Sequence, residues 1–124
     1  MYVSPARQQF LADIYSTALE GGIQYWCVTL RRTNSSPVGD STWPLVAIAP
    51  DGKDGSNWEP KTLTRNDIAR AVRMIRDDRD NVLVNKATRT VLLEANREND
   101  ASNIDASIAD SIVQIAAFGE VVYG

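Results

Sequence analysis

The stretch Ala18-Leu-Glu-Gly-Gly-Ile-Gln-Tyr-Trp26 marks the junction where a helix is predicted to end and a β-strand to begin. Gly21 can adopt the left-handed conformation that closes a helix, and Gly22 allows the backbone to reverse direction. The run that follows, from Ile23 to Arg32, is rich in β-branched and aromatic residues and is predicted to be a strand. The junction therefore predicts a helix followed by a strand, and it does not indicate what reaction or ligand the protein serves.

The neighbouring segments extend this pattern in both directions. Ser4 followed by Pro5 is a typical helix start, so the first helix is predicted to run from there to about Glu20. Beyond the junction, residues 43–49 and 58–63 are predicted to be a second and a third strand, because two Asp-Gly turn signals separate them. Three consecutive strands of this kind favour an antiparallel meander.

The second half of the chain is predicted to be helical. Thr64 with an aspartate three residues later approximates a capping box, and Asn85 and Asp105 can cap two further helices. One face of the last helix is predicted to point inward, with Ile108, Ile112, Ile115 and Ala116. Gly119 is predicted to end this helix, and residues 121–123 are predicted to form a docked tail or an edge strand. We therefore expect one globular α+β domain over residues 1–124, with a small antiparallel sheet of about three strands, and the C-terminus as an optional fourth, packed with about four helices.

Composition limits the chemistry that the chain can perform. The 124 residues are 44% hydrophobic and 23% charged, which is typical of a soluble globular protein, and no apolar run reaches the roughly 18 residues of a membrane span. The chain contains no histidine, so Ser-His and Cys-His nucleophile pairs and the usual zinc sites are excluded. The single cysteine, Cys27, is interpreted as a small buried side chain. We expect neither a metal nor another cofactor, and we expect no enzymatic activity.

Three separated signatures resemble a family of small uncharacterised proteins from actinobacteria and their bacteriophages. They are Ala18–Ile23 followed by Tyr25 and Trp26, Thr62–Thr64 before Ile68–Arg70, and Ile112–Gln114 with Phe118–Gly124. The resemblance spans nearly the whole chain. It implies a compact α+β protein encoded by a phage or a prophage-bearing genome, and it brings no catalytic residue or cofactor with it. Residues 1–5 lack the basic and apolar regions of a signal peptide, so the chain is expected in the cytoplasm of the bacterial host cell. Phage origin favours a small protein that binds a host or phage macromolecule.

An arginine-rich helix is the first candidate surface. Arg70, Arg73 and Arg76 lie within the predicted helix of residues 65–79, where guanidinium groups can bind phosphates. Aspartates lie among them at i,i+4 spacing, so internal pairing is expected to cancel much of the positive field. The main interpretation is a solvated, self-paired face, and contact with nucleic acid or with an acidic protein are the alternatives.

Aromatic side chains are dense in the predicted sheet, and they form the second candidate surface. They are Tyr25, Trp26, Trp43 and Trp58. Strand alternation sends Tyr25 and Trp26 to opposite faces of the sheet. Either helices cover both faces, or an aromatic patch is left open that anchors a partner or a second copy of the chain.

Glu20 and Glu120 form the third candidate, since each flanks a glycine at the end of a predicted helix. Two converging carboxylates can perform acid and base chemistry or bind a divalent cation, although a cap or a salt bridge to an arginine explains them as well.

The function expected from the sequence is that of a non-enzymatic binding protein that contacts a host or phage protein through the sheet aromatics and the loops. A nucleic-acid-binding module that uses the arginine-rich helix is the alternative, and a small ligand-binding or sequestering protein is a further one. No membrane partner is expected.

Overall fold

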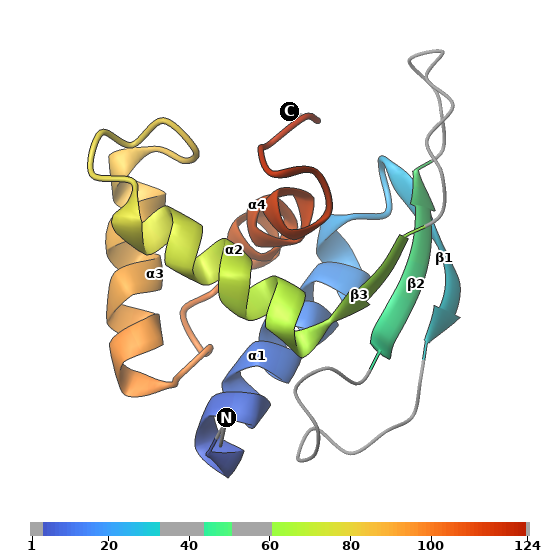
Figure 1. Cartoon of the computed structure of the whole chain (residues 1–124), viewed down its shortest axis with the longest axis horizontal. Coiled ribbons are helices and arrows are strands. Elements are labelled where there is room, and N and C mark those ends of the chain that lie inside the picture. Colours follow the sequence, from blue (N-terminus) through green and yellow to red (C-terminus); the bar gives the residue numbers. More distant parts are fainter. Residues whose placement is uncertain (1–3, 33–43, 51–60, 124) are drawn as a thin grey trace.

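The computed structural model of the chain describes residues 4–32, 44–50 and 61–123, and for residues 28–32 and 44–50 it describes the backbone alone. In chain order the elements begin with the helix α1 (Pro5–Thr17), the short π-helix η1 (Ala18–Gly22) and the strand β1 (Cys27–Arg32). The strands β2 (Pro44–Pro50) and β3 (Lys61–Thr64) follow, and then the helices α2 (Arg65–Asp77), α3 (Lys86–Glu98) and α4 (Ala106–Phe118). Figure 1 shows the three strands at one side of the molecule and α3 at the opposite side.

Local side-chain caps begin the four α-helices where the sequence predicts them. The side chains that accept a hydrogen bond from a backbone N–H of the first turn are those of Ser4, Thr64, Asn85 and Asp105. The capping box at Thr64 is complete, because its backbone N–H also donates to Asp67 Oδ2 at 2.8 Å. Gly119, with a φ of 81°, ends α4 in the left-handed conformation, as predicted.

The α+β description of the fold is wrong, because the helices form its framework. Of the residues whose side chains the structure describes, 66% are helical, and β3 is the single strand that lies wholly among them. The backbone traces of the three strands lie in the order β1-β2-β3 with antiparallel neighbours, at the edge of this helical body (Figure 1). No strand is assigned to residues 121–123, so the optional fourth strand is wrong as well.

The helix α4 explains why helices rather than a sheet organise the core. Its sequence is apolar on almost every side, and eight of its residues are buried: Ile108, Ala109, Asp110, Ile112, Val113, Gln114, Ile115 and Ala116. A helix that is hydrophobic all round must be enclosed by other elements. Accordingly, α4 packs against α1, η1 and α2. The sequence prediction gave α4 one inward face and therefore underestimated how central it is.

The junction at Gly21 and Gly22 differs from the prediction. Neither glycine has a positive φ, and Gly119 is the one glycine of the described residues that does. Instead, the helix widens into the π-turn of η1, and the N–H of Ile23 donates to the carbonyl of Ala18 at 3.0 Å. The chain then turns through Ile23 to Trp26, and the strand begins at Cys27, four residues later than expected.

Close helix packing is the physical reason for the second glycine. A Cβ atom built on Gly22 would lie 2.7 Å from the carbonyl oxygen of Ala106 and 3.3 Å from the Cβ of Asp110, both in α4. A Cβ atom on Gly21 would make an ordinary contact of 3.7 Å with the Ala106 Cβ. Gly22 therefore allows η1 to approach α4 more closely than any other residue would.

These contacts predict different effects for two neighbouring substitutions. Gly22→Ala should lower the free energy of unfolding by about 1–3 kcal/mol, because α4 must move away from η1. Gly21→Ala should leave it unchanged or raise it by up to about 1 kcal/mol, since alanine is favoured over glycine within a helix. Urea unfolding of the two variants, followed by circular dichroism, measures the difference. Equal effects of the two substitutions would contradict the close approach at Gly22.

Helix length also bears on membrane insertion. Within the described ranges, every helix is too short or too polar to cross a lipid bilayer.

Candidate functional site

The turn after η1 is tied to α4 by one buried carboxylate, that of Asp110. Asp110 is 8% exposed, and its Oδ1 accepts a hydrogen bond of 2.7 Å from the indole Nε1 of Trp26. Its Oδ2 accepts a hydrogen bond of 2.7 Å from the hydroxyl of Tyr25. The side-chain amide of Gln114, one turn later in α4, donates to Asp110 Oδ1 at 3.0 Å. We call these four side chains the Asp110 cluster.

Tyr25 and Trp26 therefore converge, and the prediction that they lie on opposite faces of a sheet is wrong. Strand alternation does not apply to them, because both precede the first strand residue, Cys27. In the turn from Ile23, the N–H groups of Trp26 and Cys27 both donate to the Ile23 carbonyl, at 3.1 Å each. Both polar tips consequently reach Asp110.

The two aromatic rings differ in exposure, and this difference matters for binding. The ring of Trp26 is in the core, with 1% of its surface exposed, whereas 48% of Tyr25 is exposed. The Tyr25 hydroxyl is nevertheless fixed at the buried carboxylate. Tyr25 is thus an exposed aromatic side chain whose position is held by a hydrogen bond at its tip.

Gln114 links the same cluster to the segment after α4. Its Oε1 accepts hydrogen bonds from the backbone N–H groups of Val122 at 2.8 Å and Tyr123 at 2.7 Å. Its Nε2 donates to the carbonyl oxygen of Tyr123 at 3.0 Å, and the Tyr25 hydroxyl lies 3.2 Å from that oxygen. Residues 121–123 are therefore a docked tail, which is one of the two forms that the sequence predicted. In Figure 1 this segment curls back over the end of α4.

Asp110 and Gln114 were not among the residues selected from the sequence. The signal that could have found them is their position, since they are polar residues at i,i+4 spacing inside an otherwise apolar helix. A buried polar side chain needs hydrogen-bond partners, so such a pair indicates a polar network within the core. The partners themselves, more than 80 positions earlier in the chain, carry no local signal.

Trp43 and Trp58 lie outside the described residues. Cys27 is buried, in agreement with its interpretation as a small buried side chain.

The three candidate arginines of α2, Arg70, Arg73 and Arg76, are exposed, whereas Arg65 at the start of the same helix is buried. Two of the exposed arginines pair with aspartates. Arg70 binds Asp67 Oδ1 at 2.8 Å and the carbonyl oxygen of Ala116 at 2.8 Å. Arg76 binds Asp77 at 2.9 Å, in place of the partner four residues later that the spacing suggested. Both pairs lie at the surface, where solvent screens such interactions.

Arg73 is exposed and belongs to a group of three cations with Arg76 and Arg7 of α1. The guanidinium of Arg7 donates to side-chain oxygens of Asn96 and Asn99, which bring no negative charge. Burial, and then the charges of Arg73 and Arg76, lower the pKa of Arg7. Arg7 and Arg73 therefore lie close enough to repel each other, while the ion pair with Asp77 offsets the charge of Arg76.

Glu20 and Glu120 are both exposed, the first in η1 and the second in the segment after α4. Neither belongs to the Asp110 cluster, so the buried carboxylate of the site is a third one. In the described part of the chain, no group of three metal-ligating side chains is placed to hold an ion.

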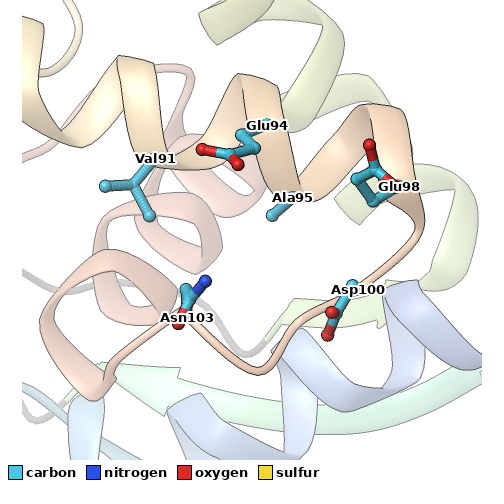
Figure 2. A pocket seen from close by; sticks show the side chains of 6 residues that line it. All are labelled: Val91, Glu94, Ala95, Glu98, Asp100 and Asn103. Atoms are coloured by element: carbon cyan, nitrogen blue, oxygen red, sulfur yellow. The ribbon is translucent and has the colours of Figure 1, made fainter.

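A hollow of about 350 Å³ lies between α3 and the loop that leads to α4. Figure 2 shows Val91, Glu94, Ala95 and Glu98 of α3 on one side of it and Asp100 and Asn103 on the other. The loop side is stabilised locally, because Asp100 accepts a hydrogen bond of 2.9 Å from the Ser102 N–H, which lowers the pKa of the Asp100 carboxyl.

Comparison with known proteins gives no relative: no family model, no curated protein and no solved structure matches the chain.

The environment of Tyr25 predicts a specific pH dependence. Burial of the hydroxyl, and then its hydrogen bond to Asp110 and the charge of that carboxylate, raise the pKa of Tyr25 to about 12. An unfolded tyrosine has a pKa of about 10, so the stabilisation that neutral Tyr25 provides is complete below pH 10 and is lost as the pH rises towards 12.

The variant Tyr25→Phe isolates this contribution, because it keeps the ring and removes the ionisable hydroxyl. We expect it to be less stable than the unchanged chain at pH 8 and to approach the stability of that chain as the pH rises from 10 to 12. Chemical unfolding at a series of pH values measures both curves. Two curves that stay parallel through this range would show that the hydroxyl of Tyr25 does not donate to a carboxylate in the folded protein.

Proposed function

We propose that the chain is a small non-enzymatic binding protein, of phage or prophage origin, which acts in the cytoplasm of a bacterial host by contacting a host or phage protein. The observation that carries this proposal is the exposed ring of Tyr25, fixed at its hydroxyl by Asp110 and Gln114. Aromatic residues dominate the binding energy of protein interfaces, and a side chain that is already ordered loses little entropy on binding.

The surroundings of Tyr25 fit a protein interface. Val122 is 39% exposed, and the side chain of Gln114 binds both its backbone N–H and the Tyr25 hydroxyl. Two exposed carboxylates belong to the neighbouring parts of the chain, Glu20 in η1 and Glu120 two residues before Val122. Apolar contacts with a charged rim are typical of transient interfaces, and acidic residues favour a partner with basic residues at its rim.

Catalysis is not part of the proposal. The chain lacks histidine, and the ionisable side chain of the site with a strongly raised pKa is a tyrosine that stays protonated at neutral pH. Its hydroxyl is engaged in holding the fold together.

The proposal is tested by capturing partners from a host lysate with the purified chain and two variants. Tyr25→Ala removes the anchor and should reduce recovery of the partner at least about tenfold, the effect of losing one dominant interface residue. Val82→Ser serves as the matched control, because Val82 is 81% exposed in the connection between α2 and α3, which Figure 1 shows on the α3 side of the molecule. Equal recovery with Tyr25→Ala and with Val82→Ser would contradict the proposed surface.

Nucleic-acid binding is a second candidate function, favoured by the cations Arg7, Arg73 and Arg76. Nuclease treatment of the lysate before capture distinguishes the two. A partner that binds through protein contacts is recovered as before, whereas one bridged by nucleic acid is lost.

A further inference from the structure

The segment Val121–Tyr123 is bound to the rest of the chain in the way that a protein binds an extended peptide. The N–H and the C=O of Tyr123 both pair with the side-chain amide of Gln114, at 2.7 and 3.0 Å. The N–H of Val122 shares the same Oε1 at 2.8 Å. One side chain thus presents to this backbone the donor and the acceptor that a neighbouring β-strand would present.

An aromatic slot accompanies these backbone contacts. The ring of Tyr123 stacks on Trp26, with 5.2 Å between centroids and 11° between planes. Phe118 completes the slot, with centroids 6.1 Å from Tyr123 and 5.6 Å from Trp26 in an edge contact. Stacked and edge-to-face rings at these distances attract each other beyond the effect of burial alone.

Every residue that forms the slot comes from outside the segment that fills it. Trp26, Gln114 and Phe118 belong to the turn after η1 and to α4, and the first two are almost fully buried. The hydrogen bonds that Trp26 and Gln114 donate to Asp110 involve no atom of the segment. We call these three residues the tail slot.

The connection between α4 and the segment allows movement. Gly119 has a φ of 81° with open space around its Cα, and both Gly119 and Glu120 are exposed. Residues 119–123 belong to no helix or strand, and they are held by the packing of Val121 and Tyr123 and by hydrogen bonds to Gln114. Segments of this kind open locally at much lower free energy than the core unfolds.

We propose that the tail slot is a peptide-docking site, which Val121–Tyr123 occupies within the chain and which a partner protein occupies with an extended segment of its own. The inference rests on the proposed function and names how the partner engages the surface. Within the bound segment, Gln114 forms hydrogen bonds with backbone atoms, and the ring of Tyr123 stacks in the slot. The partner segment therefore needs an extended backbone and an aromatic side chain. Its other side chains are not specified by these contacts.

When Val121–Tyr123 fills the tail slot, the slot binds the partner segment more weakly. A tethered segment has an effective concentration in the millimolar range, and the apparent affinity for a free peptide falls by the fraction of chains in which the slot is open. Weakening the tethered segment should therefore strengthen binding of a free one.

The experiment uses the full chain and a fluorescently labelled peptide with the sequence of residues 119–124, Gly-Glu-Val-Val-Tyr-Gly. Fluorescence anisotropy should show that the variant Tyr123→Ala binds this peptide at least tenfold more tightly than the unchanged chain does. Adding Gln114→Ala to that variant should remove most of the gain, and a peptide with alanine in place of the tyrosine should not bind. Equal binding by Tyr123→Ala and by the unchanged chain would overturn the proposal.

A second measurement needs no variant and remains decisive if Tyr123→Ala does not fold. Amide hydrogen exchange in the unchanged chain should show the N–H groups of Val122 and Tyr123 exchanging at least a hundredfold faster than that of Ile112 in the middle of α4. Equal protection would show that the segment leaves only when the whole protein unfolds, which overturns the proposal.

Two further outcomes are distinguishable. A concentration-dependent dimer of the unchanged chain that Tyr123→Ala abolishes would show that a second copy, rather than a partner protein, fills the slot, and this overturns the proposal as stated. The peptide and exchange measurements use purified protein alone, whereas the test of the proposed function captures a partner from lysate. Either set of measurements can therefore fail while the other succeeds.

Discussion

The hydrogen bonds to the buried carboxylate of Asp110 are the interaction on which the rest of the structure depends. Burying a carboxylate costs several kcal/mol unless donors compensate it, and three side chains from two regions of the chain supply them. Trp26 and Tyr25 come from the turn after η1, and Gln114 comes from α4 itself. The carboxylate therefore fixes where the chain leaves the first helix and enters the strands.

Two other features follow from this contact. The first is the close approach of η1 to α4, which requires the missing side chain of Gly22. The second is the position of Gln114, whose amide is oriented by Asp110 on one side and binds the backbone of Tyr123 on the other. One buried charge thus orders the exposed ring of Tyr25 and the slot that holds the segment after α4, which are the two parts of the proposed binding surface.

The helix starts could be predicted from the sequence because their causes are local. A side chain at Ser4 or Asp105 caps a backbone N–H three residues later, and nothing distant decides whether it does so. The junction at Gly22 could not be predicted in the same way, since the reason for the glycine is the carbonyl of Ala106, far along the chain. A left-handed helix end is the local explanation for such a glycine, but at Gly22 the contact with α4 decides the conformation.

The candidate site was predicted only in part, again because contacts between distant segments decide it. The aromatic pair was singled out, but its orientation was wrong, because the strand begins only at Cys27 and the preceding turn directs both Tyr25 and Trp26 towards α4. The fold class was wrong because the apolar residues of α4 were assigned to one face, whereas they surround the helix. A helix buried on all sides requires other helices around it, and this requirement is not visible in any single segment.

The most direct test of the role of Asp110 is the free energy of unfolding of Asp110→Ala, compared with that of Asp100→Ala, which removes an exposed carboxylate whose hydrogen bonds are local, to Ser102. The account predicts a loss of about 3–5 kcal/mol for Asp110→Ala, because a buried indole N–H and a tyrosine hydroxyl lose their acceptor, and a loss below about 1 kcal/mol for Asp100→Ala. It also predicts that the Val122 and Tyr123 amides lose their protection from hydrogen exchange in Asp110→Ala. Similar small losses for both variants, with the segment after α4 still protected, would contradict it.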